Sequence, residues 1–277
     1  WRALRFMGTG VSDILLPLIR PGFESAAMSA WNEHIESLTG VDLIDLQQMR
    51  HDTGAMLADP AALTQQAVCP VLELPDRFED YVKTLGKSLR YDVSKGLRRE
   101  FEWRASLSPQ DAQANFEVFL DLHSQRWRKR GLPGAFGFKK IQRFHREFLR
   151  LGGSLVELET LWHEGCAIGA LYVMATPTSS FFYQSGFDPQ AKKLCPGTVL
   201  VAGAIRRAIE SGRTHFDFLR GDEPYKLRWQ PQRVVPNYRL ITTIGGVRGS
   251  LGSWVNRVES ALEERIRRRL EGRGLIS

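Results

Sequence analysis

The densest group of chemically useful side chains follows a short apolar stretch near residue 216. In FDFLRGDEPYKLRW, residues 216–229, the alternation around Phe216 and Phe218 predicts a strand that stops at Gly221. Around its end stand Arg220, Asp222, Tyr225 and Lys226. A carboxylate can accept a proton, a phenol can donate one, and a cation can stabilise negative charge. Alternatively, Asp222, Lys226 and Arg228 could form a surface ion network that pins the turn, with Tyr225 and Trp229 packed beneath it.

A second group suits anion binding because it precedes a predicted helix. The loop AKKLCPGTV supplies the charges of Lys192 and Lys193, then Gly197, which lets a ligand approach the backbone, and Thr198, a candidate N-cap. The N–H groups and dipole at the start of a helix favour phosphate. The alternative is a lysine-bearing turn before a core helix. The motif GxxxxGK[ST] is absent from the sequence, which disfavours a P-loop nucleotide site.

The histidines and cysteines do not suggest metal or thiol chemistry. The six histidines are scattered and form no HExxH motif, so we expect no metal. The three cysteines form no CxxC pair, and their odd number argues against a disulfide framework and for a reducing cytoplasm. Cys195 lies in the lysine-bearing loop without a partner histidine, which favours an inert thiol over a nucleophile.

Composition and charge describe a folded, basic protein. Its 277 residues are 43% hydrophobic and 25% charged, enough for one large domain or two smaller ones. No apolar run reaches the ~18 residues needed to span a bilayer, so we expect a soluble chain. The net charge of +7 fits nucleic acid, an anionic membrane or a phosphorylated cofactor as a partner. The chain begins at Trp1 rather than Met, so we expect a piece of a longer protein.

The N-terminal part predicts strands around one helix. The spacing of Phe23, Ala27, Trp31 and Ile35 places one apolar residue on the same helical face every four residues. The predicted strands are LRFMG, DILLPLI and VDLIDLQQM, and the predicted loop is DTGAMLADPAAL.

The remainder predicts a mixed α/β fold, with a mixed sheet. After the strand CPVLELP, Asp76 is a candidate helix cap, Gly86 interrupts the helix, and a basic helix covers residues 87–100. From residue 154 the apolar period changes to two, which predicts three antiparallel strands. A buried helix at 198–211 then leads to the strand at 214–219, and a crossover of this kind makes the flanking strands parallel. Asp217 on that strand is explained as well by a structural role as by a functional one. The structural role would be to pair with an arginine of the basic helix.

This order of elements resembles the core of GNAT acyltransferases. More closely, YQSGFDP…LCPGTVL…AIRRAIESGRTHFDFLRGDEPYKLRW is similar to the CelD/BcsL-type acetyltransferases, which are associated with cellulose or exopolysaccharide gene clusters. DFLRGDEPYKLRW is the most specific part, and the similarity extends over about residues 76–250. The basic run KSLRYDVSKGLRRE resembles the Arg-rich helix of that type and of the FemABX peptidyltransferases, which carry two GNAT-like domains.

The resemblance implies a domain organisation. Residues 1–72 would be the remaining part of an N-terminal GNAT-like domain, and residues 73–250 the C-terminal GNAT acyltransferase domain. Residues 251–277 form a predicted amphipathic basic helix, with an apolar stripe that starts at Trp254 and ends at Leu270. Packing of this stripe on the protein body is the simpler expectation, and contact of the arginine-rich face with an anionic membrane is the alternative.

The resemblance also implies the roles of the two side-chain groups. Acetyl-CoA or another acyl-CoA would be the donor, with its pyrophosphate at Lys192, Lys193, Gly197 and Thr198. Tyr183 and Gln184, on the preceding strand, would line the pantetheine arm. Asp222, Tyr225 and Lys226 would be catalytic, and Arg90, Arg98 and Arg220 would bind substrate. KKLCPGT only loosely matches the usual Q/RxxGxG/A loop of this fold, and Fem-type relatives use aminoacyl-tRNA as the donor.

The expected function is therefore N- or O-acyl transfer from acyl-CoA to a saccharide or cell-envelope acceptor, by direct attack in a ternary complex in the cytoplasm of a bacterium. One alternative is Fem-like transfer from aminoacyl-tRNA. Another is a non-catalytic GNAT-like module whose basic face holds nucleic acid or an anionic membrane. The sequence does not indicate the acceptor, the acyl chain or the oligomeric state.

Overall fold

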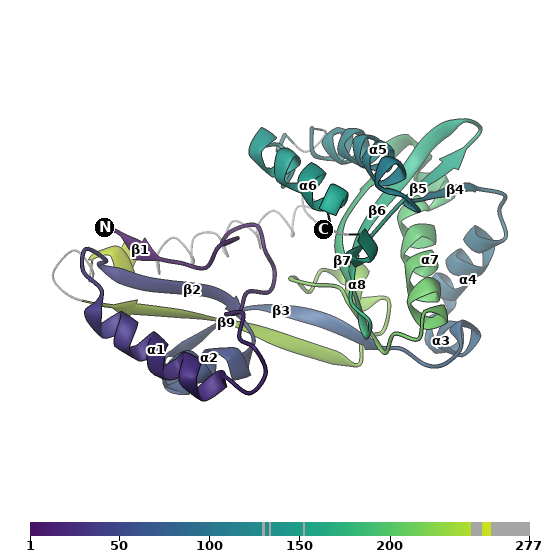
Figure 1. The fold of residues 1–277 in the computed structure, drawn as a ribbon. Helices are drawn as coiled ribbons and strands as arrows, with labels where there is room; N and C mark the ends of the chain where they lie inside the picture. Colours follow the sequence, from purple (N-terminus) through teal and green to yellow (C-terminus); the bar gives the residue numbers. More distant parts are fainter. Residues whose placement is uncertain (129–130, 133, 152, 245–250, 256–277) are drawn as a thin grey trace. The chain divides into compact units, whose positions relative to one another are not determined.

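The computed structural model describes residues 1–128, 131–132, 134–151, 153–244 and 251–255 (Figure 1). The chain forms two compact units. The first unit contains residues 1–69, residues 220–222 and the described residues from 234 onward. The second unit contains residues 70–219 and 223–233. Most of β9 (Arg233–Thr243) thus belongs to the first unit, although its sequence lies within the range 73–250 expected for the second domain.

The first unit packs helices against strands. Its strand order is β1 (Ala3–Leu4), β2 (Leu43–Met49), β9 and then the first part of β3 (Leu63–Glu73). β1 runs parallel to β2, and β2 runs antiparallel to β9. Residues of α1 (Glu24–Ser37) and α2 (His51–Leu57) pack on the core formed by β2 and β9. The predicted buried strand VDLIDLQQM is confirmed by β2.

Three expectations for the first unit are wrong. Of the predicted strand LRFMG, only Leu4 lies in a strand, because β1 ends there. DILLPLI forms no strand, and its Pro17 lacks the N–H that strand pairing requires. DTGAMLADPAAL is not a loop, because most of it forms α2 and a short 3₁₀ helix at Pro60–Ala62. Gly54 lies inside α2 and does not interrupt it. Its missing side chain leaves room for the side chain of Leu63. A Cβ there would lie 2.7 Å from the Leu63 side chain.

The second unit is built on a mixed sheet. Its strand order is the end of β3, then β8 (His215–Asp217), β7 (Ser179–Phe187), β6 (Cys166–Ala175), β5 (Val156–His163) and β4 (Glu102–Ala105). The strands from β4 to β7 are antiparallel neighbours, and β7 runs parallel to β8. The predicted three-stranded meander and the parallel pair are therefore confirmed.

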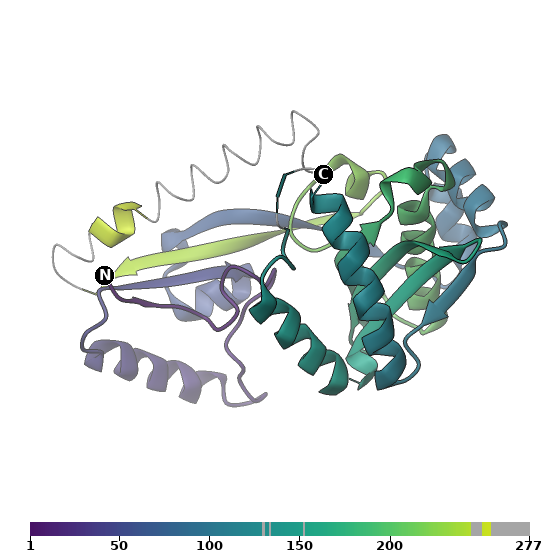
Figure 2. The same cartoon turned by 90° about the horizontal axis from the view of Figure 1, so that it is seen from above.

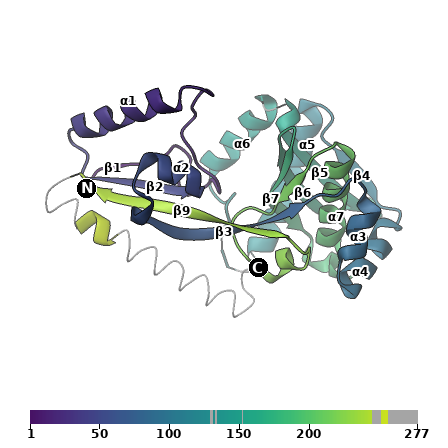
Figure 3. The same cartoon turned by 90° about the horizontal axis from the view of Figure 1, so that it is seen from below.

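Helices cover both faces of this sheet (Figures 1 and 3). α3 (Phe78–Thr84), α4 (Lys87–Leu97) and α7 (Pro196–Glu210) pack in one core with the sheet. On the opposite face, α5 (Pro109–Arg128) and α6 (Lys139–Leu151) form the other core, and Figure 2 shows them beside each other.

The boundaries of α3 and α4 in the second unit differ from those expected from the sequence. Gly86 separates α3 from α4 as expected, and α4 ends at Leu97 rather than at residue 100. Asp76 is not a helix cap, because α3 begins after Arg77 and has no side-chain cap hydrogen bond. An isolated acidic residue before an apolar run is therefore a weak start signal here.

The amphipathic helix predicted over residues 251–277 lies largely outside the described residues. Residues 251–255 are helical and the Trp254 side chain is 63% exposed. The rest of the predicted apolar stripe and the arginines beside it fall in residues 256–277, which the structure does not describe. Across the described residues, none of the helices has both the length and the apolar character that crossing a bilayer requires.

Candidate functional site

Strands β7 and β8 part after the first third of β7. They pair only over Ser179, Ser180 and Phe181, whereas β7 continues to Phe187. Within the described part of the chain, the second half of β7 has no paired strand on the β8 side. An extended ligand could therefore lie along this strand edge and use its backbone N–H and C=O groups.

A β-bulge at Tyr183 accompanies the parting of the strands. On β6, Tyr172 pairs with Gln184 while Val173 pairs with Phe182, so Tyr183 is an extra residue in β7. Such an insertion bends its strand and changes the direction of nearby side chains. The bend begins two residues after the last position at which β7 pairs with β8.

The end of β8 turns toward β3 rather than following β7. The buried Asp217 accepts a hydrogen bond from the backbone N–H of Leu219, 2.7 Å from its carboxylate oxygen. Leu219 has a φ of 57°, a left-handed conformation that this hydrogen bond supports. The backbone N–H of Phe218 donates to the carbonyl of Pro70 on β3. Asp217 thus has a structural role at this turn.

Tyr225 lies where the two strands separate. It belongs to the short helix α8 (Pro224–Leu227), and its ring centroid is 6.4 Å from that of Phe182. Its half-buried side chain packs against the core that contains Phe218. The segment after α8 is fixed by the hydroxyl of Tyr81, which donates to the carbonyl of Trp229 at 2.8 Å. Tyr225 is therefore held beside the open edge of β7.

The helix that follows β7 begins earlier than expected. α7 starts at Pro196, and the preceding Cys195 has a φ of 52°. Thr198 is therefore not the N-cap but lies in the first turn. Because Pro196 has no N–H, the first helical N–H groups without a partner inside the helix belong to Gly197 and Thr198.

The loop before α7 carries groups of the kind that bind a diphosphate. Lys192 and Lys193 are exposed at the end of a short 3₁₀ helix, Pro189–Leu194. A Cβ on Gly197 would meet nothing closer than the Phe187 ring, at 3.9 Å, so this side of the helix start is open. Two N–H groups and the positive end of the helix dipole thus border open space next to the end of β7, and two exposed cations lie in the segment just before them. These residues suit the pyrophosphate of CoA, whose amide-bearing arm would lie along β7.

The side chains predicted to be catalytic differ in their surroundings. Lys226 is buried, and its ammonium nitrogen lies 3.0 Å from a carboxylate oxygen of Glu223. Asp222 is exposed. Arg220 forms an ion pair with Asp13 at 3.1 Å. Arg220 and Asp222 belong to the first unit, and Lys226 belongs with Tyr225 to the second.

Two predicted substrate-binding arginines, Arg90 in α4 and Arg98 directly after it, have local backbone partners. Arg90 donates to the carbonyls of Lys83 and Leu85 at 2.5 and 2.9 Å, which covers the C-terminal end of α3. Arg98 donates to the Ser94 carbonyl at 3.1 Å. Arg98 follows Gly96, where a Cβ would lie 2.5 Å from Val199 in the first turns of α7. The close approach at Gly96 therefore brings the end of α4 to the start of α7.

The predicted wall residue Tyr183 belongs to a buried network that the sequence did not reveal. The ring nitrogens of His145 lie 3.2 Å from the Tyr172 hydroxyl and 3.1 Å from the Tyr183 hydroxyl. Burial lowers the pKa of His145 to about 4, so the imidazole is neutral at pH 7. The one available signal was spacing, because His145 and Leu149 share the inner face of α6. Gln184 follows on β7 and is half-buried.

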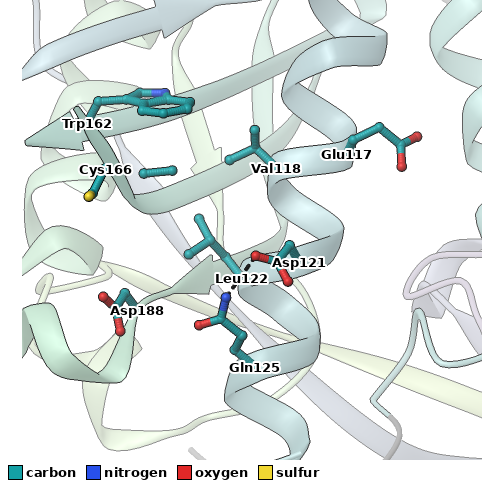
Figure 4. Close-up of a pocket in the computed structure, with 9 residues that line it drawn as sticks. Glu117, Val118, Asp121, Leu122, Gln125, Trp162, Cys166 and Asp188 are labelled. Atoms are coloured by element: carbon teal, nitrogen blue, oxygen red, sulfur yellow. Dashed lines mark hydrogen bonds between the residues drawn. The ribbon is translucent and has the colours of Figure 1, made fainter.

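A cavity of about 480 Å³ lies on the α5 side of the sheet (Figure 4). Its lining includes Glu117, Asp121, Gln125 and Asp188. These acids already have partners. Glu117 bonds to Arg146, Asp121 accepts from Gln125, and Asp188 accepts from the N–H of Gln190 in its own loop. The cavity borders the start of the loop before α7 without adding a cation to it. In the described segments, no group of three or more His, Cys, Asp or Glu side chains could hold a metal ion.

Comparison with solved structures shows a shared fold. The C-terminal domain of a protein described as a lysylphosphatidylglycerol synthetase from Agrobacterium fabrum superposes with a TM-score of 0.60 at 13% identity, covering 86% of this chain and 78% of that one. FemX gives a TM-score of 0.58 at 10% identity, covering 79% of this chain and 76% of that one. L-PGS from Bacillus licheniformis gives a TM-score of 0.53 at 13% identity, covering 77% of this chain and 72% of that one. No curated protein matches the sequence.

A family model described as acetyltransferase (GNAT) domain matches residues 87–227. The match does not show whether the chain is of the CelD/BcsL type within this family. It begins at α4 and ends in α8, so it includes β7, the start of α7 and Tyr225. Because the match spans half of the chain and contains both the parted strands and the helix start beside them, this protein belongs to the GNAT acetyltransferase family.

Proposed function

We propose that this protein transfers an acyl group from acyl-CoA to an amine or hydroxyl of a saccharide or cell-envelope acceptor. The single observation that supports this most is the parting of β7 from β8 beside the open start of α7. The strand edge suits the amides of the pantetheine arm, and the helix start suits the pyrophosphate. Because acyl-CoA is a cytoplasmic metabolite, we place the reaction in the cytoplasm.

Direct attack in a ternary complex fits the available side chains. The acceptor nitrogen or oxygen attacks the thioester carbon and gives up its proton, and the carbon–sulfur bond then breaks to release the CoA thiolate. Asp222 is the proposed group that orients or deprotonates the acceptor. Tyr225, held beside the edge of β7, is the proposed donor of a proton to the thiolate.

The two cations have different proposed roles. Lys226 is buried against Glu223, with its ammonium 5.9 Å from the centre of the Tyr225 ring. It is proposed to stabilise the negative charge that develops during the transfer. Arg220, paired with Asp13, is proposed to bind the acceptor.

Arg98 is proposed to bind phosphate rather than the acceptor. It is exposed, and it follows Gly96, which contacts the beginning of α7. Arg90, with its guanidinium held by two carbonyls at the end of α3, is proposed to keep that helix in place beside the basic helix.

The acceptor class rests on the similarity of DFLRGDEPYKLRW to exopolysaccharide-associated acetyltransferases. Fem-like transfer from aminoacyl-tRNA is the alternative, and it differs in its donor. Mass spectrometry of acceptor products can separate the two, with acetyl-CoA and charged tRNA as parallel donors and with saccharides and amino sugars as acceptors.

We expect acetylated product from acetyl-CoA in the wild type and none from charged tRNA. Asp222→Asn should lower the yield, while Asp52→Asn, an exposed carboxylate on α2, should not. Product formed from charged tRNA alone would overturn the proposed donor. Equal yields from wild type and Asp222→Asn would remove the proposed role of Asp222.

A further inference from the structure

Helix α6 presents large apolar side chains to solvent. Phe144 is 61% exposed and Leu151 is 70% exposed, two helical turns apart on the same side. Phe138, just before the helix, is 63% exposed, and Leu155, just after it, is 48% exposed. The helix is already anchored by a neighbouring face, where His145 and Leu149 are buried.

The exposed apolar residues continue from the core rather than standing alone. The Phe144 ring stacks on that of Phe148 with centroids 6.1 Å apart and an angle of 5°. Phe148 in turn packs on the core shared by α5 and α6. Single exposed apolar residues are ordinary, but several along one short helix indicate a surface that another apolar phase covers.

Cations lie beside this apolar stripe. α6 carries five lysines and arginines against one carboxylate, Glu147, and its histidine is neutral at pH 7. Lys139, Lys140 and Arg143 are exposed. Two other cations are engaged, because Arg150 pairs with Glu147 at 3.0 Å and Arg146 pairs with Glu117 at 2.8 Å.

We propose that this face of α6 docks the protein on an anionic lipid membrane. Phe144 and Leu151 enter the boundary between headgroups and acyl chains, while Lys139, Lys140 and Arg143 contact lipid phosphates. A nucleic acid would use the cations but leave the aliphatic Leu151 without a partner. A second copy of the same face would bring cations against cations. The inference does not depend on the transfer reaction.

Vesicle flotation of the full chain tests this face. The wild type should float with vesicles containing phosphatidylglycerol and remain unbound with pure phosphatidylcholine. Replacing Lys139, Lys140 and Arg143 with Gln removes about 1 kcal/mol per charge, which is about fivefold in the partition coefficient for each replacement. Phe144→Ser with Leu151→Ser should lower it on the order of tenfold or more.

Matched controls come from the same unit. Leu107 is 89% exposed in the loop before α5, so Leu107→Ser removes an apolar side chain outside the proposed face. Lys87→Gln with Lys95→Gln removes exposed cations from α4. Both controls should float like the wild type. The replaced side chains of α6 are exposed, so thermal melts of every variant should match the wild type.

Three outcomes would overturn the proposal. Undiminished flotation of both α6 variants would place any membrane contact elsewhere in the chain. Equal flotation with both lipid compositions would exclude recognition of anionic lipid. Absence of flotation, together with tRNA binding that is lost only in the charge variant, would assign the cations to nucleic acid.

Discussion

At the residue scale, Tyr225 is the residue proposed to protonate the leaving thiolate. Its ring touches the aromatic cluster at the point where β7 leaves β8, and Lys226 lies beside it. Removing the hydroxyl keeps the ring in this packing and deletes the group proposed to donate the proton.

Tyr225→Phe should therefore affect chemistry more than folding. Single-turnover transfer at saturating acetyl-CoA should fall about 10²–10⁴-fold, the usual contribution of a positioned proton donor. The affinity for CoA and the thermal midpoint should stay close to wild type. Tyr91→Phe, at a 62% exposed tyrosine on α4, is the matched control and should keep full activity. Full activity of Tyr225→Phe would exclude the proposed role.

At the scale of elements, the buried histidine of α6 couples the stability of its packing to pH. The pKa of His145 is about 4 in the folded protein and about 6.5 in the unfolded chain. Since the unfolded chain binds more protons between these values, the stability that the neutral imidazole contributes is present above pH 6.5. It is lost as the pH falls toward 4.

We predict that this group removes on the order of 3 kcal/mol of stability across that window. Glu159 works in the opposite direction, because burial raises its pKa to about 7 and favours folding at low pH. Comparing wild type with His145→Gln cancels that contribution. Urea unfolding at several pH values should show a shallower acid loss in His145→Gln. Parallel profiles would refute the assignment.

The strands of the first unit depend on one buried charge. Asp45 on β2 is fully buried and pairs with Arg239 on β9 at 2.7 Å and with Arg5 at 2.9 Å. Asp45→Asn leaves Arg239, 8% exposed, without its counter-charge, which should cost about 3–5 kcal/mol.

Hydrogen exchange of β2 and β9 amides measures this loss in the first unit itself. Protection should fall strongly in Asp45→Asn. Asp52→Asn on α2 should change it little, because that carboxylate is exposed. Unchanged protection in Asp45→Asn would show that the ion pair does not hold these strands.

Helices and strands could be predicted where the spacing of apolar residues and the positions of turn residues agree. The strands β5 to β7 alternate and are joined at residues such as Gly165, so both their existence and their antiparallel order followed from the sequence. The bulge at Tyr183 did not, because an extra residue in SSFFYQSGF leaves no mark on the alternation. The start of α7 could have been predicted from the sequence, because proline is common at the first helical position. Pro196 therefore marks the start of the helix better than Thr198 does as a cap.

At the scale of the whole molecule, family membership was predictable and the detailed site was not. DFLRGDEPYKLRW pointed to the GNAT family, which the match over residues 87–227 confirms. The interpretation of residues 1–72 as part of another GNAT-like domain stays a prediction. The parting of β7 and β8 depends on a bulge and on the turn at Asp217, which arise from tertiary pairing rather than local sequence.

The central claim is that acyl-CoA binds along β7 with its pyrophosphate at the start of α7. Calorimetric titration with CoA tests it most directly, with Gly197→Asp as the variant. The added carboxylate would face the pyrophosphate, and the open space around Gly197 lets the protein fold unchanged. Gly86→Asp is the matched control, since it changes an open glycine at the start of α4.

We expect saturable CoA binding by the wild type and by Gly86→Asp. In Gly197→Asp the dissociation constant for CoA should rise about tenfold or more, equivalent to at least ~1.4 kcal/mol. No CoA binding by the folded wild type, or equal affinity in a folded Gly197→Asp protein, would contradict the proposed CoA site.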